Sequence, residues 1–488
     1  MTSLDKDLMS IQETRNLIMS AKKAQEIYKT FSQEKVDAIV KAVAAAAEKE
    51  ASRLAKMAFE ETGFGKWEDK IVKNTFASKV VYEKIKDMKT VGIIREEKVG
   101  KYFEVAVPVG VVAALIPSTN PTSTTIYKTL ISLKSGNGIV VSPHPNAKNC
   151  IIETANILKE AAVNAGAPEG LIGCIIIPSL DATNILMKHK DTALILATGG
   201  EAMVKAAYSS GTPAIGVGPG NGPAFIDKSA NVSLAVKRIL DSKTFDNGVI
   251  CASEQSIVVE SSMKETVINE FKKQGAYFLN EEESQKLGNF ILRANGTMNP
   301  QIVGKSVETL ASMAKLNVPK GARVLISEQT TVGKNNPYSR EKLTPILAFY
   351  TVESVEDGIK LCTEILMNEG KGHTLVIHSE DENIVREFGL RIPVSRLLVN
   401  TPGALGGIGA STNLVPALTL GCGAVGGSST SDNIGPMNLL NIKRVAYGVK
   451  ELEELKGSES VQPTVQIPEE YLELIISKVV EKLALINK

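Results

Sequence analysis

Cys251 is the residue of this sequence whose surroundings best suit nucleophilic chemistry. It lies in FDNGVICASEQS (245–256), after an Asp-Asn-Gly turn signal and before two small residues. A turn and small neighbours would leave a thiol at the mouth of a cleft, where a carbonyl carbon could approach it. A small buried hydrophobic residue is the alternative interpretation of any cysteine. The five cysteines are widely and irregularly spaced, which predicts neither a disulfide framework nor a metal knuckle.

Asn120 and His373 are the candidate partners of this thiol. Addition to a carbonyl needs hydrogen-bond donors where the oxyanion forms, and Asn120, in IPSTNPTST (116–124) after a buried strand, has a suitable side chain. An Asx turn before Pro121 is the equally open alternative. His373 follows a Gly-Lys-Gly segment, which could aim an imidazole into a cleft, whereas a structural histidine is the commoner case. Because no His, Asp and Cys have metal-ligand spacing, the sequence predicts no metal.

Two glycine-rich segments resemble nucleotide-binding loops but lack their context. GCGAVG (421–426) is followed by GSSTSDN rather than by a helix, and no acidic residue stands at the required distance. GVGPGNGP (216–223) has prolines where a helix should begin. Nucleotide binding therefore cannot be inferred from these glycines alone.

The elements that must position these residues alternate along the chain. After a helical N-terminal third, short β-branched runs alternate with amphipathic helical patterns. The ten strand candidates are 109–116, 138–142, 172–177, 193–197, 223–227, 256–260, 323–327, 346–350, 374–378 and 396–400. Continuous apolar strands between helices favour parallel sheets covered on both faces, and hence an α/β fold with two main domains.

Composition excludes several classes of function. Lys and Arg number 55 against 54 Asp and Glu, so the chain lacks the one-signed charge that binds nucleic acid or an anionic membrane. The uncharged stretch 105–127 is interrupted by prolines and is expected to be a buried strand and a loop, not a membrane span. The N-terminus mixes both charge signs where a signal peptide needs an apolar run. With unpaired cysteines, this predicts a cytoplasmic protein.

Six motifs in order resemble those of the coenzyme-A-acylating aldehyde dehydrogenases. They are IPSTNPTSTTIYKTLISLKSGNGIVVSPHP (116–145), PAIGVGPGNGPAFID (213–227), FDNGVICASEQS (245–256), EKLTPIL (341–347), EGKGHT (369–374) and TLGCGAVGGSSTSDNIGP (419–436). The resemblance implies the aldehyde dehydrogenase fold, with a Rossmann-like cofactor domain, an α/β catalytic domain and a small β oligomerisation arm. The expected ranges are 1–240, 241–423, and 99–112 with 424–456, respectively. The arm implies a homodimer or homotetramer.

The resemblance also assigns roles to residues. Cys251 matches the nucleophile, Asn120 with the Cys251 backbone N–H matches the oxyanion hole, and His373 matches a histidine of the coenzyme A half-reaction. Glu341 matches the residue that holds the nicotinamide ribose. The other expected cofactor-binding residues are Ser118, Thr119, Ser142, His144, Thr198, Gly199, Gly200, Val217 and Gly218. NAD is the predicted cofactor, but no acidic residue near Ser142 and His144 excludes the 2′-phosphate of NADP.

One departure from the wider superfamily predicts the reaction. Hydrolytic aldehyde dehydrogenases place a general-base Glu in a Glu-Leu-Gly-Gly motif, whereas this chain has Val-Gly-Pro-Gly from Val217 to Gly220. An acyl-enzyme without a water-activating base would pass its acyl group to coenzyme A. The expected reaction converts a short-chain aldehyde, first of all acetaldehyde, to its acyl-CoA, with propionaldehyde and sulfoacetaldehyde as alternatives. An acyl-phosphate reductase, a hydrolytic dehydrogenase and a non-catalytic assembly subunit are the competing hypotheses.

The C-terminus carries a segment that this chemistry does not require. Residues 457–468 have linker composition, and 469–488 follow helical spacing with an apolar face. Such a helix could pack on a neighbouring subunit or dock in a groove of a partner. It resembles the encapsulation peptides of bacterial microcompartments, which implies a shell or cargo partner and a location inside such a compartment.

Overall fold

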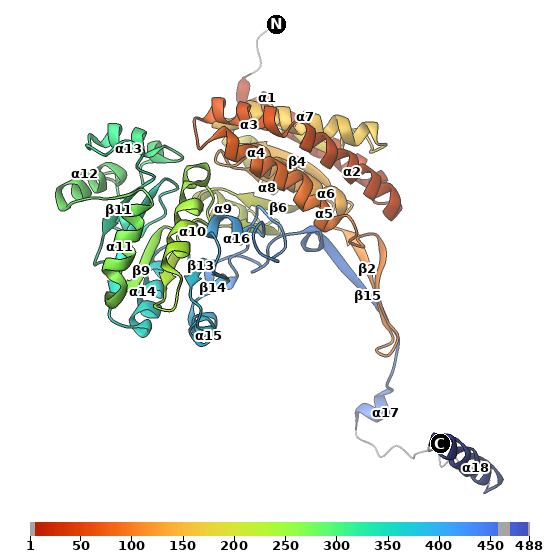
Figure 1. Ribbon diagram of the computed structural model, residues 1–488. Helices are drawn as coiled ribbons and strands as arrows, with labels where there is room; N and C mark the ends of the chain where they lie inside the picture. Colours follow the sequence, from red (N-terminus) through yellow and green to blue (C-terminus); the bar gives the residue numbers. More distant parts are fainter. Residues whose placement is uncertain (1–4, 457–468, 487–488) are drawn as a thin grey trace. The chain divides into compact units, whose positions relative to one another are not determined.

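The computed structural model describes residues 5–456 and 469–486. The chain forms two compact units, one made of Met1–Ile94 and Val105–Lys443, the other of Arg95–Glu104 and Arg444–Lys488. The larger unit contains two parallel sheets with helices around them (Figure 1). These sheets position every site residue predicted from the sequence.

The first sheet of the larger unit has five strands in the order β5-β4-β3-β6-β7, and all pairs are parallel. Its strands are β3 (Val111–Ile116), β4 (Gly138–Pro143), β5 (Ile172–Cys174), β6 (Thr192–Thr198) and β7 (Ala214–Val217). Successive side chains of a strand point to opposite faces. Accordingly, Val112 and Ala114 belong to one hydrophobic core, and Val111 and Ala113 to another on the opposite face. Burial on both faces explains the continuous apolar sequence of β3.

Helices pack against both faces of the five-stranded sheet. One core includes residues of α2, α6 and α7, and the other includes residues of α1, α8 and α9. The helices of this region are α1 (Lys6–Tyr28), α2 (Gln33–Lys49), α3 (Ala51–Thr62), α4 (Trp67–Thr75), α5 (Val81–Ile85), α6 (Pro121–Lys134), α7 (Lys148–Asn164), α8 (Leu180–Lys188) and α9 (Glu201–Tyr208). In α2, Val36, Ile39, Val40 and Val43 recur at helical spacing and are fully buried.

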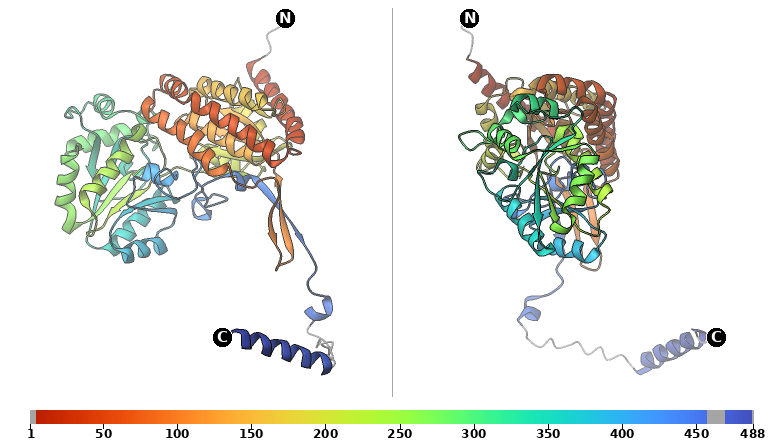
Figure 2. Two further views of the ribbon diagram at one scale, coloured as in Figure 1. Left: turned by 45° about the vertical axis from the view of Figure 1, so that its right-hand side comes forward. Right: turned by 60° about the vertical axis from the view of Figure 1, so that its left-hand side comes forward.

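The second sheet has seven parallel strands in the order β10-β11-β12-β9-β8-β13-β14. They are β8 (Pro223–Ile226), β9 (Ser256–Glu260), β10 (Ala276–Phe278), β11 (Val324–Glu328), β12 (Ile346–Val352), β13 (Gly372–His378) and β14 (Val394–Val399). The same alternation separates its cores, because Val258 and Leu325 face one core, and Ile257 and Ile326 the other. In Figure 2, the green-to-cyan part of the chain, 223–399, forms this sheet and its helices.

The helices around the second sheet lie between its strands in the sequence, except for one helix that follows the last strand. They are α10 (Val232–Thr244), α11 (Lys264–Lys273), α12 (Glu281–Ile291), α13 (Val307–Ala314), α14 (Val355–Asn368), α15 (Glu382–Arg391) and α16 (Gly403–Gly407). Residues of α10 and α11 contribute to one core of this sheet, and residues of α12, α13, α14 and α15 to the other. Each large sheet is thus the middle of a three-layer α/β sandwich.

A third sheet joins distant parts of the chain in the order β1-β2-β15. Its strands are β1 (Gly92–Glu97), β2 (Tyr102–Pro108) and β15 (Leu440–Ala446), and two short C-terminal elements follow, α17 (Leu452–Leu455) and α18 (Glu469–Ile486). Within the smaller unit, Arg444 pairs with Glu104. The side chains of 471–483 in α18 are all exposed. Across the described ranges 5–456 and 469–486, no helix combines the length and apolarity that crossing a bilayer requires.

All ten expected strands are present, and the α/β fold class is confirmed. The expected domain limits stay predictions. Strand β8 lies within the expected cofactor range 1–240, and α10 begins within that range and ends four residues beyond it. Both contribute to the seven-stranded sheet or its core. The expected linker 457–468 lies outside the described residues.

Candidate active site

The loop that carries Cys251 begins with a turn of unusual backbone geometry. Asp246 and Asn247 have φ angles of +48° and +51°, a region that Asn and Asp tolerate better than most residues. The Nδ2 of Asn247 donates to the carbonyl oxygens of Gly65 and Gly304, at 3.2 and 3.0 Å. These bonds hold the turn, and hence the start of the Cys251 loop, against two other segments of the larger unit.

Cys251 lies partly buried in the wall of a cavity of about 510 Å³. Burial raises the pKa of its thiol to about 12, the Glu341 carboxylate and Cys422 act in the same direction, and Arg396 opposes them. A thiol with so high a pKa is protonated at neutral pH. To act as a nucleophile, this thiol would need added positive charge or hydrogen-bond donors that stabilise the thiolate.

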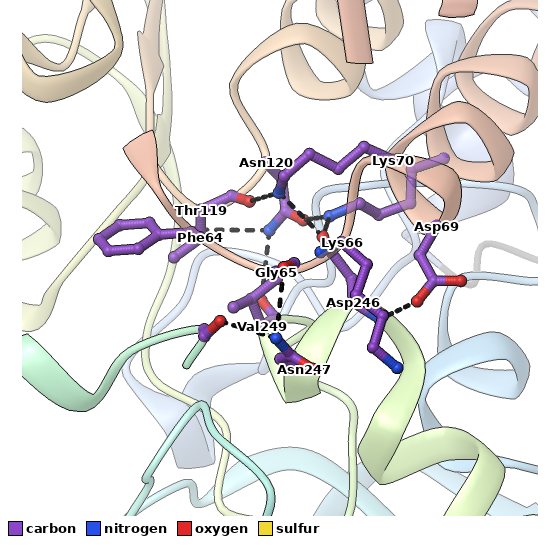
Figure 3. A network of polar contacts seen from close by, with 12 residues as sticks. Phe64, Gly65, Lys66, Asp69, Lys70, Thr119, Asn120, Asp246, Asn247 and Val249 are labelled. Carbon is purple, nitrogen blue, oxygen red and sulfur yellow. Dashed lines mark hydrogen bonds and ion pairs between the residues drawn. The ribbon is translucent and has the colours of Figure 1, made fainter. Parts of the chain in front are cut away.

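Asn120 lines the same cavity and faces the Cys251 loop. It precedes α6, but its side chain makes no capping hydrogen bond to that helix within the described chain. Instead, Nδ2 donates to Thr119 Oγ1 at 3.2 Å and to the carbonyl oxygen of Val249 at 3.4 Å (Figure 3). Val249 is two residues before Cys251, so the Asn120 amide donates into the loop that carries this thiol and could serve as an oxyanion donor there.

The residues predicted to bind the cofactor surround this one cavity. The lining includes Ser118, Thr119, Ser142, His144, Thr198, Gly199, Gly200, Val217, Gly218 and Glu341. Most of them follow the carboxyl ends of β3, β4, β6 and β7, which meet at one edge of the parallel sheet. Ligands bind at this edge in open α/β sheets.

The start of α9 fits a diphosphate group. Gly199 and Gly200 line the cavity immediately before this helix, and among the described residues no side chain caps it. A methyl group added to Gly200 would meet no atom within 4 Å, so the backbone is open to a ligand. Unpaired N–H groups and the helix dipole favour a phosphate at this position. The cavity thus fits a dinucleotide cofactor.

Glu341 is the only carboxylate among the described residues that line the cavity. Its Oε1 accepts a hydrogen bond of 2.8 Å from the backbone N–H of Gly220. Burial, and then the Glu369 carboxylate, raise the pKa of Glu341 to about 8. The group is largely protonated at neutral pH, and its Oε1 already accepts the Gly220 N–H. The Val217-Gly218-Pro219 segment of the wall carries no ionisable side chain.

The pattern of the Aldehyde dehydrogenase family matches residues 7–413. The chain belongs to the aldehyde dehydrogenase family. An acetylating aldehyde dehydrogenase from Geobacillus thermoglucosidasius superposes with a TM-score of 0.90 at 54% identity, covering 92% of this chain and 99% of that one. A Listeria monocytogenes EGD-e structure, described as a probable aldehyde dehydrogenase, superposes with a TM-score of 0.92 at 68% identity, covering 92% of this chain and 100% of that one.

Among curated proteins, the bifunctional aldehyde-alcohol dehydrogenase AdhE of Escherichia coli K12 is 46% identical over 442 residues, which are 90% of this chain and 50% of AdhE. The chain therefore spans about half the length of curated relatives such as AdhE. The predicted resemblance to acylating aldehyde dehydrogenases and the predicted aldehyde dehydrogenase fold are confirmed.

In this member of the aldehyde dehydrogenase family, His373 is not among the residues that line the cavity. Its side chain is 1% exposed, Nδ1 lies 2.9 Å from Thr374 Oγ1, and Nε2 has no hydrogen-bond partner among the described residues. Burial, and then the charge of Arg396, lower the pKa of His373 to about 3, so the imidazole is neutral. A role of His373 toward coenzyme A stays a prediction.

Sequence reasoning missed three buried cations near the aldehyde dehydrogenase site. Lys70 and Lys73 of α4 reach the Asp246 carboxylate, and Arg396 of β14 donates to the carbonyl oxygens of His373 and Gly421. The two lysines stand three residues apart in EDKIVKN, the spacing of one helix face. That spacing was visible, but nothing in the sequence showed that this face is buried. In the part of the chain that the structure describes, no group of three or more His, Cys, Asp or Glu could hold a metal ion.

Proposed function

We propose that this chain is a coenzyme-A-acylating aldehyde dehydrogenase that converts a short-chain aldehyde, NAD and coenzyme A to an acyl-CoA and NADH. The observation that carries the proposal is the placement of Cys251 and Asn120 on one cavity in which Val217 stands where hydrolytic members of the family are expected to carry a general-base Glu. Acetaldehyde is the first candidate substrate, and propionaldehyde and sulfoacetaldehyde are the alternatives. NAD is the proposed cofactor, and the assay must include NADP.

In the first step, the Cys251 thiol loses its proton to solvent, and the resulting thiolate attacks the aldehyde carbon through Sγ. The carbonyl π bond breaks as the C–S bond forms, and its electron pair leaves a negative charge on the oxygen of the thiohemiacetal. Nδ2 of Asn120 and the backbone N–H of Cys251 donate hydrogen bonds to it. Preorganised donors of this kind contribute about 3–4 kcal/mol each to stabilising the transition state.

In the second step, the C–O double bond re-forms as a hydride leaves the carbon, and Cys251 then carries a thioester. The oxidised nicotinamide, when bound, accepts that hydride and brings positive charge to the cavity. Gly199 and Gly200 would hold the diphosphate at the start of α9, and Glu341 would hold the ribose. The Cys251 loop and Asn120 keep the reacting carbon in place throughout.

In the third step, the thiolate of coenzyme A attacks the thioester carbon, and the bond to Cys251 Sγ breaks. A thiolate needs no general base at this point, whereas water does. Val217 stands where hydrolytic members of the family carry the base, and it cannot accept a proton. Attack by water is therefore slow, and the acyl group is retained until coenzyme A arrives.

A panel of aldehydes, assayed for NADH absorbance with NAD or NADP and with or without coenzyme A, tests this proposal. We expect steady turnover only with coenzyme A and an acyl adduct on Cys251 in its absence, detected by mass spectrometry of the intact protein. Rapid accumulation of free carboxylic acid would show a hydrolytic enzyme. The lack of any adduct at position 251 would remove the basis of the mechanism and favour an assembly subunit.

We propose further that the enzyme is a cytoplasmic homodimer or homotetramer and that α18 docks to a partner. Supporting observations are the strands β1, β2 and β15, which form a separate small sheet, and the exposed apolar Leu472, Ile476 and Val479 of α18. The candidate partners are a neighbouring subunit and a microcompartment shell or cargo protein. Deletion of residues 457–488 separates them. Lost solubility or activity supports subunit packing, and full activity with lost co-localisation supports targeting.

A further inference from the structure

A buried lysine outside the cavity wall contacts the amide of Asn120. Lys73 lies on α4, is 2% exposed, and its Nζ donates to Oδ1 of Asn120 at 2.5 Å. The same ammonium forms an ion pair with Asp246. Figure 3 shows Asn120 and Asp246 within this network of polar contacts. Lys73 is not among the residues that line the cavity, so it would act through Asn120 rather than on a substrate.

This contact determines which way the Asn120 amide faces. An ammonium group has three donors and no acceptor, so only the amide oxygen can face Lys73 favourably. The NH₂ group must then point the other way, toward Thr119 and Val249, which both line the cavity. Without Lys73, the free energies of the two flipped orientations of the Asn120 amide would differ much less. In one of these orientations the amide oxygen, which can only accept a hydrogen bond, would point toward the oxyanion.

Asp246 connects this contact to the nucleophile loop. Its carboxylate is fully buried, and it accepts hydrogen bonds from the Lys66 backbone N–H at 2.7 Å and from Lys70 Nζ at 3.0 Å, in addition to Lys73. Asp246 is also part of the turn that leads to Cys251. Asp246 therefore holds the Lys73 ammonium that contacts Asn120, and it also belongs to the backbone turn that precedes Cys251.

We propose that Lys73 is a positioning residue that orients and polarises the Asn120 amide as an oxyanion donor. This inference rests on the proposed function, because it assigns Lys73 to the thiohemiacetal step. A charge-assisted hydrogen bond to Oδ1 draws electron density from the amide and makes its N–H a stronger donor. The Asn120 amide group would lie between the Lys73 ammonium and the oxygen that becomes negative. Both charges are in a buried region, where charges interact strongly.

The titration of Lys73 supports this geometry. Burial lowers its pKa to about 8, while the carboxylates of Asp246 and Asp69 act against that shift and Lys70 reinforces it. The ammonium therefore dominates below pH 8 and is progressively lost above it. Any contribution of its charge to the oxyanion step should decrease over the same range.

Lys73→Met tests the inference, because it removes the charge and the donor at similar length. Lys66 N–H and Lys70 still pair with Asp246, so the buried carboxylate keeps partners. In the esterase assay, acylation of Cys251 by p-nitrophenyl acetate passes through an oxyanion and releases p-nitrophenol in a burst, whereas alkylation by iodoacetamide is a displacement that forms no oxyanion. We expect the burst rate constant to fall about tenfold or more at pH 7, with the alkylation rate changed less than about twofold. In an Asn120→Ala background, the same substitution should cost less than about twofold, because the two residues act as one unit.

Lys134→Met is the matched control, because Lys134 is equally buried, pairs with Asp37 at 2.5 Å and does not line the cavity. It should leave the rate constant of the p-nitrophenol burst within about twofold of wild type. If Lys73→Met does not fold, Lys73→Gln, which keeps a neutral donor, should show a smaller loss with the same dependence on Asn120.

An unchanged esterase rate, an equal loss in the Asn120→Ala background, or an equal loss of alkylation would each overturn the assignment of Lys73. In those cases wild type would still form the Cys251 adduct, and the proposed function would stand. If wild type forms no adduct, both proposals fail.

Discussion

The backbone of Gly220 packs so closely on Cys251 that a methyl group on Gly220 would lie 1.9 Å from the Cys251 carbonyl oxygen. The N–H of Gly220 also donates to Glu341 at 2.8 Å. Gly220, in the Gly-rich segment 216–223, thus contacts both the backbone of Cys251 and the Glu341 carboxylate, which is predicted to hold the ribose. This segment fails as a dinucleotide-binding fingerprint, and its glycine is explained by close packing instead.

Gly220→Ala should therefore displace the Cys251 loop. Because a misplacement of about 1 Å at a reacting atom can cost about 100-fold, we expect kcat to fall by that order with the fold retained. Single-turnover NADH formation and circular dichroism are the measurements. Gly333→Ala is the control, since a methyl group there meets no atom within 4 Å, and it should behave as wild type. Full activity of Gly220→Ala would show that the loop can shift without consequence.

Cys251→Ala should abolish aldehyde oxidation, acyl transfer and esterase activity, because each needs the Sγ atom. Cofactor binding should persist, since the glycines at the start of α9 are untouched, and quenching of NADH fluorescence measures it. Cys174→Ala is the matched control, because Cys174 is also partly buried but does not line the cavity. Activity retained by Cys251→Ala, or lost equally in Cys174→Ala, would contradict the assignment of the nucleophile.

Hydrophobic patterning predicted the two large sheets well. Runs such as 109–116 are continuously apolar because both faces of β3 are buried, and this signal does not depend on distant contacts. Strands β7 and β10 were missed. β7 (Ala214–Val217) runs into a segment rich in Gly and Pro, and β10 (Ala276–Phe278) has only three residues. In both strands, pairing with a neighbour in the sheet outweighs weak local preference.

Without the resemblance to a family, the candidate site was predictable only where a residue type is unusual for its setting. Cys251 and Asn120 stood out, and the structure places both on one cavity. The turn at Asp246 and Asn247 was visible, but its bonds to Gly65 and to the lysines of α4 join segments that lie 173 to 182 residues apart. Such contacts leave no periodic trace in the sequence. Long-range pairing therefore explains why Lys73 was missed.

Val217→Glu should convert the enzyme partly to a hydrolase. The side chain of Val217 lines the cavity, and a carboxylate there could activate water against the Cys251 thioester. We expect free acid to form without coenzyme A and the yield of acyl-CoA to decrease, as measured by chromatography of the products. Val217→Gln introduces a side chain of the same size as Glu but without a base, so it should form no more free carboxylic acid than wild type. If both variants hydrolyse alike, altered packing rather than a base is responsible.

The reactivity of Cys251 should depend on the charge of Glu341. Burial sets the high pKa of the thiol, about 12, and the Glu341 carboxylate raises it further. Because the pKa of Glu341 is itself raised to about 8, its negative charge is present above pH 8 and mostly absent below pH 7. Glu341→Gln removes that charge, so it should stabilise the thiolate and speed alkylation only above pH 8.

The rate of iodoacetamide labelling at position 251, followed by peptide mass spectrometry from pH 6 to 10 without cofactor, measures this effect. The two profiles should coincide near pH 6–7 and separate above pH 8, with the variant faster. A Cys174→Ala background removes the other partly buried thiol from the signal. Identical profiles at high pH would mean that the carboxylate and the thiol do not interact, and slower labelling of the variant would mean that Glu341 assists thiolate formation.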